Sequence, residues 1–290
     1  MLRLKVGFLL AAFAIVPIAA EANSCPESYA ALARAPVHQR GEALVSATYG
    51  RLEELKAGRL PGIEVEVIGT SDGFPIQLVR VRSPNPKAAR VFVSSGVHGD
   101  EPEGVTTGMA LLENTIRSRR YDLTYVPMMN PGGLRAETRA NLAKLDINRS
   151  FDPGVGTEAA EALKKAMRGR NFEVAVDLHG ASQKTQFFLI SAKEEGARAD
   201  EILKNVPEAL LLPSSTGTYP GYAPGLNDPK KYRMLFPGSA ISNNGGTLKD
   251  FLAAYAPRSY TLEYPGAVDF SLQQEWNYRI LNSILETAEK

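Results

Sequence analysis

Residues 89–118 read ARVFVSSGVHGDEPEGVTTGMALLENTIRS, and the pattern changes in the middle of this stretch. The first part contains the continuous apolar run Val91-Phe92-Val93, which predicts a buried strand. The second part, from residue 101, carries apolar residues at helical spacing. A strand that leads directly into a helix is the building unit of α/β folds, so this stretch indicates the fold class.

The same alternation continues along the chain. Further strands are expected at 63–70, 75–83, 121–130, 172–180, 186–191 and 258–265, and further helices at 156–169, 194–206, 247–256 and 271–290. Residues 27–57 predict two short helices interrupted at Pro36 and Gly41, and residues 130–154 and 213–246 predict loops. We therefore expect an α/β fold with a mixed, largely parallel central sheet and helices on both faces.

The N-terminus has the features of an export signal. Arg3 and Lys5 precede an uncharged, mostly apolar run over residues 6–20, and residues 20–22 (Ala-Glu-Ala) form a small-x-small cleavage site. The run is shorter than the roughly 20 residues that span a bilayer, which favours a cleaved signal over a membrane anchor. We expect residues 1–22 to be a signal peptide and the mature protein to be periplasmic or secreted, without membrane insertion. Acylation of Cys25 as a lipoprotein is the alternative.

The rest of the chain divides into an N-terminal helical segment, residues 23–58, and a main domain, residues 59–290. Cys25 is the only cysteine, so no intramolecular disulfide can form. The formal net charge of +1 does not indicate nucleic acid as a partner.

Two of the three histidines directly follow or end predicted strands: His98 in GVHGDE and His179 in VAVDLHG. Ligands of α/β sheets bind beyond the carboxyl ends of the strands, so these positions are candidates for a site. With Glu101 they form a set of two imidazoles and one carboxylate, which hydrolytic zinc sites use while leaving a position open for water. Glu101 would also suit the first turn of a helix as a capping carboxylate, and each histidine could be structural.

A metal-bound water needs a base, and a substrate needs orienting groups. Glu263 is a carboxylate in the predicted strand RSYTLEYP, although it could also be an exposed position on an edge strand. The loop at 130–151 contains Arg135, Arg139 and Arg149, and guanidinium groups bind carboxylates bidentately. Arginines in a loop can also be plain solvated charges.

Several short motifs that occur in a fixed order are stronger evidence than any one of them alone. His-x-x-Glu after a strand, the NPGG stretch at 130–133, TRAN and DINRSF, then DLHG, then TLEYP resemble the zinc metallocarboxypeptidase (funnelin) family. The resemblance begins at about Ile63, with VIGTSDGFPIQLVRV similar to the opening strand pair of that family, and reaches the C-terminus. It implies that residues 59–290 are a zinc carboxypeptidase-like catalytic domain.

The resemblance also implies a role for each matching residue. His98, Glu101 and His179 would bind one zinc ion, Glu263 would be the general base, and Arg139 would stabilise the charge that develops on the scissile carbonyl. Asn148 and Arg149 would bind the terminal carboxylate of a peptide substrate, to which Arg135 is a further candidate contact, and Leu248 would line the side-chain pocket. A hydrogen-bond acceptor is expected behind each ligating imidazole. Asp177 is expected to point away from His179, to the opposite face of its strand.

The chain departs from the family pattern in three places. Ile241 stands where the family often has a mobile tyrosine, so Tyr219, Tyr222 or Tyr232 would have to replace it. Asp100, between the first two ligands, stands where digestive members have arginine and is similar to bacterial members. The 81 residues from His98 to His179 indicate a compact core with short loops.

These features predict a secreted zinc-dependent carboxypeptidase or amidase that acts on a terminal amide of small peptides. Compact, exported bacterial members suggest peptidoglycan stem peptides as substrates. Two alternatives remain. One is an N-acyl amino acid deacylase of the aspartoacylase and succinylglutamate desuccinylase type, which shares the ligand pattern and a D-x-N-R segment. The other is a non-catalytic binding module with structural zinc, which a fourth protein ligand would favour.

Overall fold

The computed structural model describes residues 37–152, 154, 156–181, 187–191, 196–207, 210–211, 234–235, 246–266 and 270–289. The predicted signal peptide and Cys25 lie outside these residues. Among the helices of the described residues, none combines the length and the apolar character needed to cross a bilayer.

The described strands form one mixed sheet of eight strands in the order β1-β2-β4-β3-β5-β8-β6-β7. Its centre, β4-β3-β5-β8, is parallel, whereas β1 and β2 pair antiparallel at one side and β6 pairs antiparallel with β8 at the other. The strands are β1 (Ile63–Ser71), β2 (Phe74–Val81), β3 (Arg90–Ser95), β4 (Asp122–Val126), β5 (Val174–Ala181), β6 (Phe188–Ser191), β7 (Met234–Leu235) and β8 (Arg258–Pro265). The predicted largely parallel sheet is confirmed.

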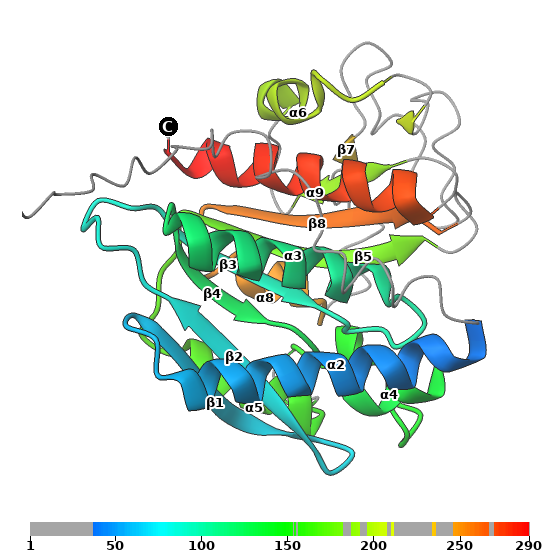
Figure 1. The fold of residues 1–290 in the computed structure, drawn as a ribbon. Coiled ribbons are helices and arrows are strands. Elements are labelled where there is room, and N and C mark those ends of the chain that lie inside the picture. The colour runs from blue at the N-terminus through cyan, green and yellow to red at the C-terminus, as the bar shows by residue number, and fades with distance from the viewer. Residues whose placement is uncertain are drawn as a thin grey trace, which may run out of the picture.

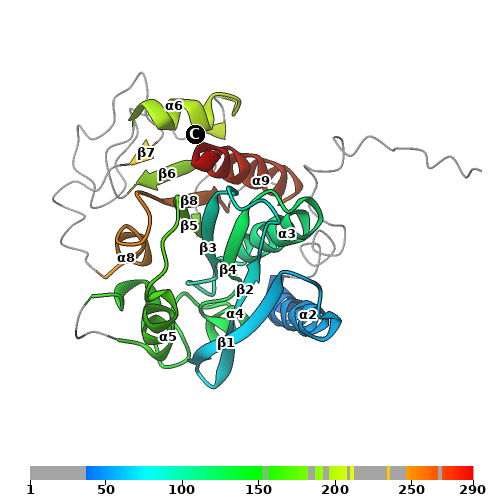
Figure 2. The same cartoon turned by 90° about the vertical axis from the view of Figure 1, so that its left-hand side faces the viewer.

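Helices cover both faces of the sheet, as predicted, and Figure 2 shows α5 and α8 on the opposite side from α2, α3 and α9. The helices are α2 (Val37–Gly58), α3 (Glu103–Ser118), α4 (Pro131–Ala136), α5 (Glu158–Met167), α6 (Gly196–Leu203), α8 (Leu248–Leu252) and α9 (Phe270–Glu286), with 3-10 turns at η1 (Ile147–Arg149) and η4 (Thr287–Glu289).

The continuous apolar run of β3 follows from this layering. Val91 and Val93 are fully buried in the core beneath α2, α3 and α9, whereas Phe92 is fully buried in the core beneath α5 and α8. Alternate side chains of a strand point to opposite faces, so a strand covered on both faces needs apolar residues at every position. Burial of each such side chain contributes about 1.5–3 kcal/mol.

The N-terminal helical segment differs from the prediction, because α2 is one helix that continues through Gly41. An added Cβ at Gly41 would lie 1.9 Å from the carbonyl oxygen of Leu134 in α4, so the glycine lets the two helices touch (Figure 1). The sequence rule that glycine interrupts a helix fails here because close packing of α2 on α4 requires the missing side chain. Leu44, Val45 and Leu52 then place α2 in the core of the main domain.

The predicted loop at 130–154 contains the short helix α4 and the turn η1, which the sequence pattern missed. Helix α4 begins with Pro131 at its first position, and the Asn130 side chain caps it by accepting from the Gly133 amide at 2.9 Å. These elements are too short for hydrophobic periodicity to show them. The strand expected at 121–130 ends at Val126, because Pro127 has no amide to continue the ladder.

Two glycines of α2 provide a matched test of this packing. Gly41→Ala is expected to lower the free energy of unfolding by about 1–3 kcal/mol, because the methyl group would meet backbone that cannot move aside. Gly50→Ala, in the same helix with nothing within 4 Å of the added atom, is expected to raise it by about 0.5–1 kcal/mol. Urea denaturation followed by circular dichroism measures both. Equal effects of the two substitutions would contradict the packing of α2 on α4.

Candidate metal centre and active site

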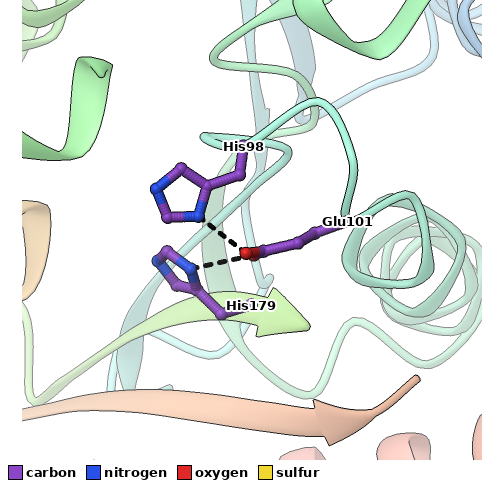
Figure 3. Close-up of side chains that lie close together, drawn as sticks. All are labelled: His98, Glu101 and His179. Carbon is purple, nitrogen blue, oxygen red and sulfur yellow. Dashed lines mark hydrogen bonds and ion pairs between the residues drawn. The ribbon is translucent and has the colours of Figure 1, made fainter. Parts of the chain in front are cut away.

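The three predicted metal ligands meet at the carboxyl end of the parallel strands. His98 follows β3, Glu101 precedes α3, and His179 lies near the end of β5. All three are buried, and their ligand atoms lie within 4.8 Å of one another. The Glu101 carboxylate lies between the rings, with Oε1 2.8 Å from His98 Nδ1 and Oε2 3.0 Å from His179 Nδ1 (Figure 3). The two Nδ1 atoms and the Glu101 carboxylate therefore converge on one place between the rings.

Glycines explain why the chain can bring these side chains together. An added Cβ at Gly99 would lie 2.0 Å from the Gly133 carbonyl carbon, so the HGD loop rests directly on the NPGG segment. The Arg139 carbonyl oxygen accepts from the Gly99 amide at 3.4 Å and from Asn130 Nδ2 at 3.3 Å. The HGD, NPGG and TRAN motifs are thus one packed unit.

The glycine of DLHG has a direct part in the site. The Gly180 amide donates to Glu101 Oε2 at 2.9 Å, and an added Cβ at this position would lie 3.3 Å from the Glu101 side chain. Glycine therefore leaves room for Glu101 while its amide holds one carboxylate oxygen in place.

A carboxylate stands behind each imidazole. His98 Nε2 lies 3.3 Å from Asp146 Oδ1, and His179 Nε2 lies 2.7 Å from Asp177 Oδ2. The expectation that Asp177 points away from His179 is wrong. The two residues are two apart on β5, and a strand repeats its side-chain direction every second residue. The expected acceptor behind each ring is present for both histidines.

The charges of this cluster stabilise each other. Burial alone would raise the pKa of the Glu101 carboxyl, but the rings of His179 and His98 outweigh it and hold that pKa well below its usual range. Burial disfavours the charged form of His179, yet the carboxylates of Asp177 and Glu101 raise its pKa well above the usual value. In the same way, Glu101 and Asp146 overcome burial and raise the pKa of His98.

The donor set fits a divalent metal ion. Each ring turns Nδ1 toward the shared point and keeps Nε2 on a carboxylate, which is the arrangement that metal-ligating imidazoles adopt. Two imidazoles with one carboxylate are the composition of open hydrolytic sites. Among the described residues, no fourth side chain joins this metal-ligating group.

Glu263, the predicted base, lies on β8 directly beside His179, because the two residues are partners in the parallel β5–β8 register. Its side chain is partly buried on the same face of the sheet. Burial raises the pKa of Glu263 to about 7, although the positive charge of His179 pulls it downward. A carboxyl with a pKa near neutrality suits proton transfer at physiological pH.

Arg139 approaches the cluster from the loop side. Its Nη1 lies 3.5 Å from Glu101 Oε1, its Nε donates to Asp146 Oδ2 at 3.2 Å, and nearly half of its side chain remains exposed. The guanidinium is therefore next to the metal-ligating group and accessible from solvent.

The residues predicted to bind substrate lie in different surroundings. Asn148 is buried beside the cluster, with Nδ2 3.4 Å from His179 Nε2 and Oδ1 accepting from the Leu248 amide at 2.8 Å. Arg149 is exposed, donates to the Asn148 carbonyl, and forms no ion pair with a carboxylate of the described residues. Leu248 is fully buried in the core beneath α8, and its role in a side-chain pocket stays a prediction.

Arg135 has structural partners instead. Its Nε lies 2.5 Å from Glu42 Oε2 on α2, and its guanidinium stacks over the Phe74 ring at 5.0 Å from the centroid. Through these contacts the Arg135 guanidinium joins α2 to the domain. A contact between Arg135 and the substrate stays a prediction. Asp100 is exposed beside the cluster. The position of Ile241 and the three tyrosines that could replace its missing phenol lie outside the described residues.

The sequence did not predict two residues that contribute to the site, Asp146 and Ser94. Asp146 is the first residue of DINR, and its spacing from Asn148 gave no indication that it reaches His98. Ser94 lies in the run VSS of β3 and donates to Asp177 at 2.8 Å. The strand period of two, applied from His179 back to Asp177, could have identified this side of the site.

Comparison with known proteins supports the fold and the superfamily. A family model for the succinylglutamate desuccinylase/aspartoacylase catalytic domain matches residues 87–221. No curated protein matches the chain. The fold is similar to that of a proposed metallopeptidase from Shewanella denitrificans, with TM-score 0.62 and 18% identity over 85% of this chain and 90% of that one.

Two metallo-carboxypeptidases share the fold as well. The enzyme from Burkholderia cenocepacia has TM-score 0.60 and 16% identity over 83% of this chain and 67% of that one. The enzyme from Pseudomonas aeruginosa, solved with (2-guanidinoethylmercapto)succinic acid, has TM-score 0.55 and 18% identity over 83% of this chain and 69% of that one. The chain therefore has a carboxypeptidase-like fold.

The metal centre predicts the effect of neutralising its carboxylate. Glu101→Gln is expected to weaken the binding of a divalent metal ion by more than the roughly 10–100-fold that loss of an outer hydrogen-bond partner costs. Chelator competition with metal analysis measures this affinity. Glu275→Gln, at an exposed carboxylate on α9 that pairs with Arg279, is the control and should bind metal like the wild type. Equal affinities of the two variants would remove Glu101 from the metal site.

Proposed function

Because the chain fits the zinc metallocarboxypeptidase family in its motifs and its fold, we propose that it is a zinc-dependent carboxypeptidase or amidase. It would hydrolyse an amide bond next to a free carboxylate. At the level of the superfamily, which includes the desuccinylases and aspartoacylases, the chain is a hydrolase. Zinc as the metal, and a peptide as the substrate, are the parts that we propose.

One arrangement carries the proposal: Glu263 beside His179 on one side of the metal-ligating group and the exposed guanidinium of Arg139 on another. Hydrolysis of an amide needs a base for water and a positive charge for the carbonyl oxygen that becomes negative. The two groups flank the same point from different elements. Arg149 adds an exposed cation that forms no ion pair with a carboxylate of the described residues, which supports a substrate with its own carboxylate.

The residues of the chain divide the reaction between them. His98, Glu101 and His179 would hold the zinc ion, which when bound would supply Lewis-acid chemistry for water and for the scissile carbonyl. Glu263 takes the proton of the attacking water and returns it to the leaving nitrogen. Arg139 stabilises the negative charge that develops on the scissile carbonyl oxygen.

The residues that we propose to bind the substrate lie in the neighbouring turn η1. Asn148 and Arg149 orient the carboxylate next to the scissile amide, Arg149 through its guanidinium and Asn148 through its amide. Because Asn148 also contacts His179 and the start of α8, it couples the position of the substrate carboxylate to the metal-ligating group.

A deacylase of N-acyl amino acids is the second candidate, and the family match over residues 87–221 favours it. The same residues would serve such an enzyme, since its substrates also combine an amide with a nearby carboxylate. The two functions differ on the acyl side of the bond, which is a peptide for a carboxypeptidase and a small acyl group for a deacylase. A non-catalytic module with structural zinc is disfavoured, because the described residues supply three ligands and structural sites use four.

The biological substrate that we propose is a peptidoglycan stem peptide. This depends on the proposed export by the signal at residues 1–22, which would place the mature protein in the periplasm or outside the cell. The structure of the Pseudomonas metallo-carboxypeptidase contains a succinic acid derivative. A carboxylate-bearing ligand in that enzyme supports a carboxylate-bearing substrate here.

The general base gives a first prediction about catalysis. Glu263→Gln is expected to bind metal like the wild type and to lower kcat about 10²–10⁴-fold, because the amide cannot accept the proton from water. Metal affinity and steady-state kinetics on the best substrate measure the two effects. Glu275→Gln serves as the control. A variant with unaltered turnover would show that Glu263 is not the base.

The proposed contact between Arg149 and the substrate carboxylate gives a second prediction. Peptides with a free C-terminus, including murein tripeptide and tetrapeptide, should be hydrolysed, whereas the same peptides with a C-terminal amide should not. Arg149→Ala is expected to raise KM for the free acids roughly 10–100-fold, which corresponds to the 1.5–3 kcal/mol of a charge-assisted hydrogen bond. Mass spectrometry of the products and steady-state kinetics give these results.

Arg279→Ala is the matched arginine control, since Arg279 is an exposed arginine of α9 that pairs with Glu275. It should leave KM unchanged, and Arg135→Ala tests the separate prediction that Arg135 contacts the substrate. Turnover of N-succinyl or N-acetyl amino acids without turnover of any peptide would establish the deacylase in place of the carboxypeptidase.

A further inference from the structure

Asp177 is a carboxylate in the middle of the sheet, with no exposed surface. Burial of a charge in protein interior is costly unless the charge is paired and hydrogen-bonded. Asp177 meets this requirement with two contacts. Its Oδ1 accepts from the Ser94 hydroxyl at 2.8 Å, and its Oδ2 lies 2.7 Å from His179 Nε2.

The position of Ser94 is set by the sheet itself. Ser94 on β3 and Asp177 on β5 are partners in the parallel register, so their side chains stand next to each other on the same face. Ser94 is also fully buried. The hydroxyl therefore has a fixed place from which it donates to one oxygen of the Asp177 carboxylate, and the other oxygen contacts the His179 ring.

The carboxylate behind the other ring has different surroundings. Asp146 is partly exposed, accepts from the Asn148 amide, and shares its second oxygen with Arg139. Its distance of 3.3 Å to His98 Nε2 is longer than the 2.7 Å between Asp177 and His179. Asp146 thus contacts Arg139 and the Asn148 amide as well as His98, whereas the hydrogen-bond partners of the Asp177 carboxylate among the described residues are Ser94 and His179.

We propose that Ser94 and Asp177 form a positioning pair that holds the His179 ring with its Nε2–H donated to Asp177 and its Nδ1 directed at the metal. The inference rests on the metal site of the proposed function. Neither residue touches the substrate, so both act through His179. The pair fixes the ring tautomer and orientation, which increases the affinity of the ligand set for the metal.

Three substitutions test the pair in the full-length protein. Asp177→Asn removes the charge and is expected to weaken zinc binding about 10–100-fold. Ser94→Ala removes only the hydroxyl donor and is expected to weaken it by a smaller factor in the same direction. Ser259→Ala is the matched control, because Ser259 is a buried serine of β8 whose hydroxyl donates to the Lys249 carbonyl and not to the metal-ligating group. It should bind zinc like the wild type.

Affinity is measured by chelator competition with zinc alone, and the ring is observed directly by NMR of the protein labelled with ¹⁵N-histidine. The zinc-loaded wild type is expected to show a His179 Nε2–H that exchanges slowly with water. This exchange should be faster in Asp177→Asn and unaltered in Ser259→Ala. If Asp177→Asn does not fold, the zinc affinity of Ser94→Ala and the exchange rate of the His179 Nε2–H in that variant decide whether the positioning pair exists.

Two outcomes overturn the inference in different ways. A wild type that binds no divalent metal ion would overturn the positioning pair together with the proposed function. A wild type that binds zinc, with affinity and Nε2–H exchange that neither substitution alters, would overturn the positioning pair alone. Weakened binding in Asp177→Asn and Ser94→Ala supports the pair whether the enzyme proves to be a carboxypeptidase or a deacylase.

Discussion

The parallel register of β3, β5 and β8 is the constraint on which the rest of the site depends. It pairs Ser94 with Asp177 across one strand boundary and His179 with Glu263 across the next. Side chains of paired residues in a sheet point to the same face, so the register alone lines up Ser94 with Asp177, and the candidate ligand His179 with the proposed base Glu263. A shift of one residue in β5 would turn Asp177 and His179 to the opposite face.

The loops beyond these strands depend on a second constraint, which is close contact between backbones. Gly99 on Gly133 joins the first two ligands to the loop that carries Arg139, and Gly180 makes space for Glu101. Gly41 joins α2 to α4 in the same way. In each case a side chain would keep apart two segments that are distant in sequence. The glycines of HGD, NPGG and DLHG therefore belong to the site even though they have no reactive group.

The shared geometry explains why two functions fit one site. A carboxypeptidase and an N-acyl amino acid deacylase require the same kinds of group, namely metal ligands, a base and a cation that binds the substrate carboxylate. We propose Glu263 and Arg149 for the last two roles in either case. The groups that separate the two functions contact the acyl side of the bond. The metal-ligating group therefore indicates the type of reaction more closely than it indicates the substrate.

The amino-acid sequence by itself determined the α/β class, the largely parallel sheet and the three metal-ligand candidates, because long apolar patterns and strand ends can be read locally. It did not reveal α4 and η1, which are too short for a hydrophobic pattern to repeat within them, or the continuity of α2 through Gly41. Only the tertiary structure placed Asp146 behind His98 and paired Arg135 with Glu42. These contacts join residues far apart in the chain, and backbone packing between whole elements sets their distances. Asp177 differs from them, because the strand period of two could have placed it beside His179, although we expected it on the opposite face.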